Sequence, residues 1–173
     1  VEKSASPVSC PPSATGSMTN TATVDGSPVT DPNPMNNSAS DTDTLAPASI
    51  QFSSATYMED ESQTASITIT RTIDTSGIST VEFSAAPGAV PAAVGGAACA
   101  PGIDFVLVSG QVVTFIAGDT EETVNVTICG GDTIQEIPAE NIALSLANAT
   151  NGAVGSPGTA VLKVNDTASQ FLQ

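Results

Sequence analysis

The sequence predicts an all-β protein: an antiparallel β-sandwich of about seven strands, with an extended arm at its N-terminus. Three observations predict this fold class. Apolar and polar residues alternate in several short runs, and a period of two places one face of a strand in a core and the other in water. Gly-, Pro- and Asn-containing turns separate these runs at the spacing of a sandwich. No stretch shows convincing helical periodicity.

The predicted sandwich begins at Ala48. Three alternating runs follow, with the apolar residues Ile50 and Phe52, Ile67 and Ile69, and Val81 and Phe83. Residues 84–100 (SAAPGAVPAAVGGAACA) have the length and the Pro and Gly content of an irregular loop. A compact domain seldom carries so long a loop without a role or a covalent staple.

Residues 102–132 contain the clearest alternation in the chain. In the first half Val113 and Phe115 alternate with Val112 and Thr114. In the second half Val124, Val126 and Ile128 alternate with Asn125 and Thr127. Ser109-Gly110 and Ala117-Gly118-Asp119 punctuate these runs as predicted turns, because Gly accepts backbone angles that other residues avoid. The pattern predicts a tight antiparallel hairpin.

Two further runs complete the predicted sandwich. Their apolar residues are Ile142, Leu144 and Leu146, and then Ala160, Leu162 and Val164. Lys163 should therefore face water. Loops are expected at residues 150–152 and 155–158, where Asn, Gly and Pro gather.

A series of short motifs runs through the same region in a fixed order. The motifs are Tyr57-Met-Glu59, Gly102-Ile-Asp104-Phe105, Ser109-Gly110, Phe115-Ile-Ala-Gly118, Asp132 with Glu136 and Glu140, and Val164-Asn-Asp166. The series resembles the Calx-beta domain, a seven-stranded immunoglobulin-like β-sandwich of sodium/calcium exchangers, integrin β4 and many bacterial surface proteins. The resemblance covers about residues 48–168 and leaves 169–173 as a C-terminal tail.

Residues 1–47 differ in composition and form the predicted arm. They are rich in Ser, Thr, Pro, Asn and Asp, which taken alone indicates a linker or a disordered segment. Yet residues 19–24 (TNTATV) and 31–39 (DPNPMNNSA) resemble the last two strands of a conserved repeat domain of bacterial surface proteins. A lone two-stranded ribbon is marginal in water. Either the arm stays flexible or belongs to a domain cut away, or it adds its strands to a sheet of the next copy.

Charge and composition exclude several classes of function. The chain has 18 acidic and three basic residues, a formal net charge of −15, so a nucleic acid would be repelled. It has no His, which removes the commonest general base, and it has no Trp and only one Tyr, so we expect no aromatic platform for a sugar near the candidate acids. No phosphate-cradling loop and no apolar run long enough to span a bilayer occur. We therefore expect neither an enzyme nor a membrane span.

Three cysteines in a chain expected outside the cell suggest one disulfide and one remaining thiol. Cys99 lies in the long loop just before Asp104, and Cys129 ends a strand at the same acidic end of the predicted hairpin, so we pair these two. Cys10 in the arm is left. It either bridges to a neighbouring copy, pairs with a protein segment elsewhere, or remains a free thiol.

Acidic residues near strand ends form the second candidate site. The resemblance implies that Glu59, Asp104, Asp132, Glu136 and Asp166 meet at one pole of the sandwich and bind calcium, which takes six to eight oxygen ligands. Calcium-sensing members carry runs of aspartates where this chain has Gly130-Gly131-Asp132 and Asn165-Asp166-Thr167, which leaves charge for one ion. The alternative is that these are ordinary solvated loop acids.

Four Asn residues match the N-glycosylation pattern: Asn36, Asn125, Asn148 and Asn165. Surface Ser and Thr could equally carry O-linked sugar, and the sequence does not decide between them. The residue usage is typical of secreted bacterial surface proteins. We expect an extracellular structural module that assembles head to tail with copies of itself through its arm. The alternative is a calcium-binding adhesion module that recognises a carbohydrate or protein ligand.

Overall fold

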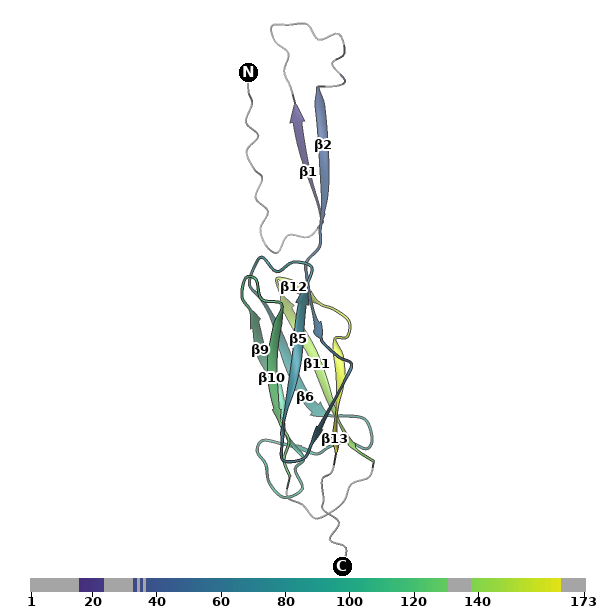
Figure 1. Cartoon of the computed structure of the whole chain (residues 1–173), viewed down its shortest axis with the longest axis vertical. Coiled ribbons are helices and arrows are strands. Elements are labelled where there is room, and N and C mark those ends of the chain that lie inside the picture. The colour runs from purple at the N-terminus through teal and green to yellow at the C-terminus, as the bar shows by residue number, and fades with distance from the viewer. Residues whose placement is uncertain (1–15, 24–32, 34, 36, 131–137, 166–173) are drawn as a thin grey trace, which may run out of the picture.

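Two β-sheets packed face to face form the body of the protein, as the computed structural model shows (Figure 1). The structure describes residues 16–23, 33, 35, 37–130 and 138–165. Within these residues no helix is long and apolar enough to cross a membrane. The predicted all-β sandwich fold is confirmed.

Four strands form one sheet, in the order β10-β5-β3-β12, and five form the other, in the order β4-β13-β11-β6-β9. The first sheet contains β3 (Ala48–Phe52), β5 (Thr64–Thr72), β10 (Glu121–Thr127) and β12 (Gly152–Val154). The second contains β4 (Thr56–Asp60), β6 (Ser79–Pro87), β9 (Val108–Phe115), β11 (Glu140–Thr150) and β13 (Thr159–Asn165). Only the β12–β3 and β13–β4 pairs within these sheets are parallel.

Two short ribbons complete the described structure. One pairs β7 (Gly95–Gly96) with β8 (Phe105–Val106). The other is the N-terminal hairpin, in which β1 (Gly16–Thr23) pairs antiparallel with β2 (Ser38–Leu45). Figure 1 shows this hairpin beyond one end of the sandwich. β1 overlaps the first segment expected to form a strand, residues 19–24, whereas β2 begins at Ser38 and shares only its first two residues with the second, residues 31–39.

The core lies between the two sheets, and the predicted period of two decides which residues fill it. The buried apolar residues of the predicted runs include Ile50, Phe52, Ile67, Ile69, Val81, Phe83, Val113, Phe115, Val124, Val126, Ile142, Leu144, Leu162 and Val164. Phe52 and Phe83 meet edge to face across the sheets, with ring centroids 6.2 Å apart. Lys163 is exposed, as predicted.

The predicted hairpin of residues 102–132 is wrong in its pairing. β9 pairs with β6, whereas β10 pairs with β5 in the other sheet. Residues 116–120 therefore carry the chain across the sandwich instead of turning it back onto the neighbouring strand. Alternation specifies which side chains are buried, but Phe115 and Val124 bury equally well from opposite sheets.

The buried side chain of Arg71 holds this crossover in place. Arg71 is 1 % exposed, and its guanidinium donates to the two loops at that end of the sandwich and to the first residue of β6. Its acceptors are the main-chain oxygens of Thr75 (3.2 Å), Gly77 (2.7 Å), Ile116 (2.7 Å) and Asp119 (2.6 and 2.9 Å), and the hydroxyl of Ser79 (3.2 Å). The planar fork of five N–H donors suits such a set of carbonyls.

Two further expectations of the sequence need correction. Ser109-Gly110 is not a turn: it lies inside β9, where Gly110 has a positive φ of 62° and the β6–β9 register shifts. The irregular loop is also shorter than 84–100, because β6 continues to Pro87 by pairing with β11. Asn141 anchors the loop that follows Pro87, since its side-chain amide donates to the oxygens of Ala89 and Pro91.

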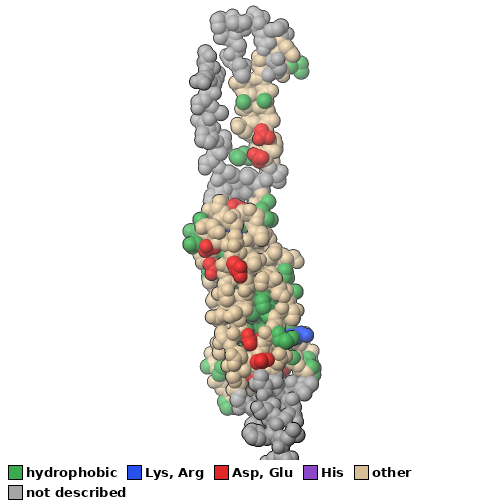
Figure 2. Space-filling view, viewed as in Figure 1, with side chains coloured by type: hydrophobic (Ala, Val, Ile, Leu, Met, Phe, Trp, Pro, Cys, Tyr) green, Lys and Arg blue, Asp and Glu red, His purple; other side chains and the backbone are tan. Residues whose placement is uncertain are grey.

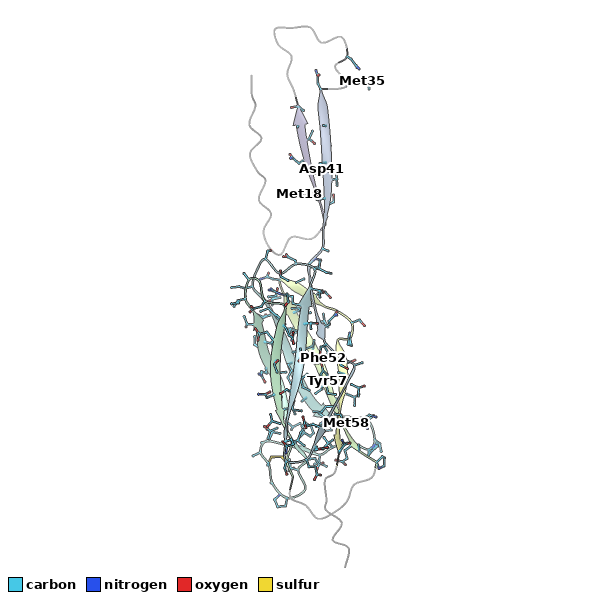
Figure 3. All side chains as sticks on the ribbon, viewed as in Figure 1. Met18, Met35, Asp41, Phe52, Tyr57 and Met58 are labelled. Atoms are coloured by element: carbon cyan, nitrogen blue, oxygen red, sulfur yellow. A yellow bond between two sulfur atoms is a disulfide. The ribbon has the colours of Figure 1, made fainter. Side chains whose placement is uncertain are left out.

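Strand β4 was not predicted. Its residues alternate between half-buried and exposed positions without a clear apolar face, so periodicity gives little signal. Tyr57 fixes this strand: its hydroxyl donates to the oxygen of Thr68 in the other sheet at 2.9 Å, and its ring meets Phe52 edge to face. Figure 3 shows Phe52 and Tyr57 together in the middle of the sandwich.

Candidate functional site

The sandwich has two ends with different chemistry. We call the end that leads to the hairpin the arm pole; it contains residues 73–78 and 116–120. The opposite end, with residues 60–63, 88–104 and 128–130, is the distal pole. Acidic side chains lie on both the hairpin and the sandwich (Figure 2), in a chain whose formal net charge is −15.

Main-chain hydrogen bonds gather four segments at the distal pole. The N–H of Cys129 donates to the oxygen of Asp104 (2.8 Å), and the N–H of Ser62 donates to the oxygen of Cys129 (3.3 Å). The N–H of Glu61 donates to the oxygen of Asn165 (3.1 Å). Residues 61–62, 104, 129 and 165, far apart in sequence, therefore lie side by side.

A disulfide joins Cys99 to Cys129 at this pole, which confirms the predicted pairing. The Cα atoms are 5.4 Å apart, and the bridge links positions separated by 30 residues. Cys129 is buried, whereas Cys99 lies on the exposed loop. The disulfide thus fastens the loop before Asp104 to the end of β10.

The hairpin at the other end has two chemically distinct faces. Paired residues in an antiparallel ribbon point to the same side, so the register places one set of Ser and Thr side chains together: Ser17, Thr19, Thr21, Thr23, Ser38, Ser40 and Thr42. Hydroxyl pairs cross the strands, Thr19 with Thr42 at 3.0 Å and Thr21 with Ser40 at 2.9 Å. The other face carries Met18, Asn20, Ala22, Ala39, Asp41 and Asp43.

A family model described as the Calx-beta domain matches residues 43–168 of the chain. The chain belongs to the Calx-beta family. The match begins at Asp43, within β2, and covers the whole described sandwich. No curated protein matches the chain.

The Calx-beta domain is a β-sandwich without catalytic function, which agrees with the fold described above. The Cys99–Cys129 disulfide agrees with a domain that faces the outside of the cell, because disulfides persist in oxidising compartments. The resemblance of the arm to a second repeat domain stays a prediction.

The structure brings together only part of the predicted calcium site. Asp104 lies at the distal pole, and its carboxylate accepts the N–H of Val94. Glu59 lies near the end of β4, and its carboxylate accepts the N–H of Asp60 at 3.3 Å. The other three predicted ligands, Asp132, Glu136 and Asp166, lie outside the described residues.

The described residues alone do not complete a calcium site. Among them no three acidic or thiol side chains come close enough together to hold a metal ion. Asp60, which the sequence did not single out, lies at the same pole, and its carboxylate accepts the side-chain amide of Asn165 at 3.2 Å. A calcium ion at this pole would therefore need further oxygen ligands from the residues that follow Gly130 and Asn165.

Three of the predicted glycosylation sites are described. Asn125 is exposed on β10 and its amide oxygen accepts a 3.4 Å hydrogen bond from Ser66. Asn148 is exposed with a positive φ of 48°, and its amide donates to Glu82 at 2.7 Å. Asn165 is half-buried and bonded to Asp60, so it is less accessible than Asn125 and Asn148. Asn36 and Cys10 lie outside the described residues.

Proposed function

We propose that this Calx-beta chain is an extracellular structural module, bacterial in origin, that assembles head to tail into a surface filament or stalk through its N-terminal arm. The hairpin carries the proposal. Within the described residues its side chains are exposed on both faces, and only Met18 and Asn37 beside it are half-buried. A two-stranded ribbon with no core is marginal in water, so a partner that adds strands to it would stabilise it.

The direction in which the hairpin leaves the sandwich favours an end-to-end arrangement. Ala46 and Pro47 alone separate β2 from β3. Such a short connection, with the φ of Pro47 fixed by its ring, favours an extended path over a fold back onto the sandwich. The hairpin therefore projects from the arm pole, at the opposite end from the distal pole (Figure 1).

Deletion of residues 1–47 tests the proposal. We expect the truncated chain to keep the sandwich, with its disulfide and its cooperative unfolding, and to sediment as a monomer. The full chain should form filaments visible by negative-stain electron microscopy. A Cys10→Ser variant of the full chain separates strand addition from disulfide linkage. Filaments formed by the truncated chain, or a full chain that stays monomeric at high concentration, would contradict the proposal.

A calcium-binding adhesion module is the second candidate, which would recognise a carbohydrate or protein ligand. The support for this candidate is the distal pole, where hydrogen bonds hold together the segments that carry Asp60, Asp104 and Asn165. If calcium binds the folded state, it raises the melting temperature with concentration. We expect Glu59→Gln to reduce that rise, with magnesium as the control ion. A melting temperature that calcium does not change would contradict this candidate.

A further inference from the structure

The outer edges of the two sheets differ in how well they are protected. An edge strand presents unpaired N–H and C=O groups, and proteins blunt such edges with charges or by keeping the strand short. β10 begins with Glu121 and Glu122, and β4 ends with Glu59 and Asp60. β12 has only three residues. Three of the four outer edges are therefore guarded.

The fourth edge strand, β9, has no such protection. Its eight residues, VSGQVVTF, contain no charged side chain and no Pro. Val112 on its outer face is 60 % exposed, and the bulge at Gly110 affects only its first half. An uncharged edge rich in β-branched and aromatic residues is a template for pairing with another strand.

Strand β1 matches β9 in length and in charge. It also has eight residues, GSMTNTAT, and none of them is charged. Its partner β2 carries Asp41 and Asp43, so the acids of the two described strands lie on the strand farther from anything that pairs with the outer edge of β1. In a chain with a net charge of −15, two copies approach at least electrostatic cost where both surfaces are uncharged.

The two strands also run in the same direction along the molecule. β1 starts beside the sandwich, because Gly16 pairs with Leu45, and runs away from the arm pole. β9 runs toward the arm pole, because Phe115 leads into the crossover at residues 116–120. Figure 1 shows both arrows pointing the same way. Copies stacked in one orientation would therefore bring these strands together in parallel.

We propose that β1 of one copy adds in parallel to the free edge of β9 in the next copy. The five-stranded sheet then continues into the hairpin of the neighbour, in the order β4-β13-β11-β6-β9-β1-β2. This inference rests on the proposed head-to-tail assembly and names the surface that receives the arm. A second copy of the chain is the partner.

A charge placed on the β9 edge tests the inference. Thr114 is exposed on β9 opposite Thr80, and Thr123 is exposed on β10, the edge of the other sheet. We expect Thr114→Glu to raise the concentration needed for assembly by about tenfold or more, because it places a negative charge on the edge that pairs with the uncharged β1 of a copy whose net charge is −15, and Thr123→Glu to leave it unchanged. Melting temperatures equal to that of the native chain show that both variants remain folded. Equal loss of assembly in both variants would overturn the inference.

Cross-linking between two different chains provides a second measurement. One chain carries Asn20→Cys in β1, the other carries Val112→Cys or Thr114→Cys in β9, and both carry Cys10→Ser. We expect a short bismaleimide to join them, and not to join the first chain to one with Thr123→Cys. Filaments that cross-link only through position 123 would refute the β9 edge but keep the head-to-tail assembly. If no filaments form at all, both the pairing of β1 with β9 and the head-to-tail assembly are refuted.

Discussion

The guanidinium of Arg71 lies over the ring of Phe115, with the Cζ atom 5.4 Å from the ring centroid. Arg71 belongs to β5 in one sheet, and Phe115 ends β9 in the other. Both side chains are buried. The contact therefore joins the two sheets at the arm pole, where the same guanidinium also donates hydrogen bonds to the carbonyl oxygens of the crossover.

Replacing Arg71 should destabilise the fold more than any surface change. Arg71→Met keeps much of the apolar volume but leaves five acceptors, the buried hydroxyl of Ser79 and four part-buried main-chain oxygens, without their donor, and we expect a loss of about 3–5 kcal/mol in the free energy of unfolding. Urea denaturation measures it. Lys163→Met, at an exposed position, is the matched control and should change stability by less than about 0.5 kcal/mol. A loss of similar size in both variants would contradict the role assigned to Arg71.

Removing the disulfide should also cost stability, through the unfolded chain. In the chain-entropy model, a link between residues 30 positions apart contributes about 3–4 kcal/mol. We expect the double variant Cys99→Ser, Cys129→Ser to lose that amount in urea denaturation. Cys10→Ser is the control, because position 10 lies outside this loop, and it should leave the unfolding curve unchanged. A double variant as stable as the native chain would contradict this account.

Periodicity predicted the core of this fold but not the partner of each strand. The alternation of Val113 and Phe115 correctly places them inside, yet the same pattern fits a hairpin with Val124 or a crossover to the opposite sheet. Only long-range contacts decide, and the main one is made by Arg71, a residue that alternation marks as an exception. β4 was missed because Tyr57 is held by a hydrogen bond of its hydroxyl rather than by an apolar face.

The candidate sites divide in the same way. The Cys99–Cys129 pairing could be predicted, because both cysteines lie near the acidic end of neighbouring segments, and the structure forms it even though the predicted hairpin is wrong. The position of β9 at the edge of its sheet could not be predicted, because it depends on the order of the strands in the sheet. The absence of charge in residues 108–115 was the available signal.

The loop after β5 should give a measurable dependence on pH. The hydroxyl and the N–H of Ser76 donate to the Asp74 carboxylate at 2.7 and 2.9 Å, which lowers the pKa of Asp74 below its ordinary value of 3.8; the charge of Arg71 adds a smaller effect. Because the folded-state pKa is depressed, this contribution to stability is present above the unfolded pKa and is lost as the pH falls through the folded one. Ser76→Ala should raise the pKa toward 3.8, measured by NMR titration of the carboxyl carbon. An unchanged pKa would contradict this cause.

Ile73 occupies a backbone conformation that its side chain disfavours. Its φ is 74°, in the left-handed region that β-branched residues rarely adopt, and its side chain is 69 % exposed, so no packing compensates for the strain. Ile73→Asn, which tolerates this region, should therefore stabilise the fold by about 1 kcal/mol in urea denaturation. Ile78→Asn is the control: Ile78 is also exposed, at 56 %, but is not among the residues with positive φ. Its replacement should bring no gain. If both variants gain stability equally, relief of exposed apolar surface rather than of backbone strain would be the cause.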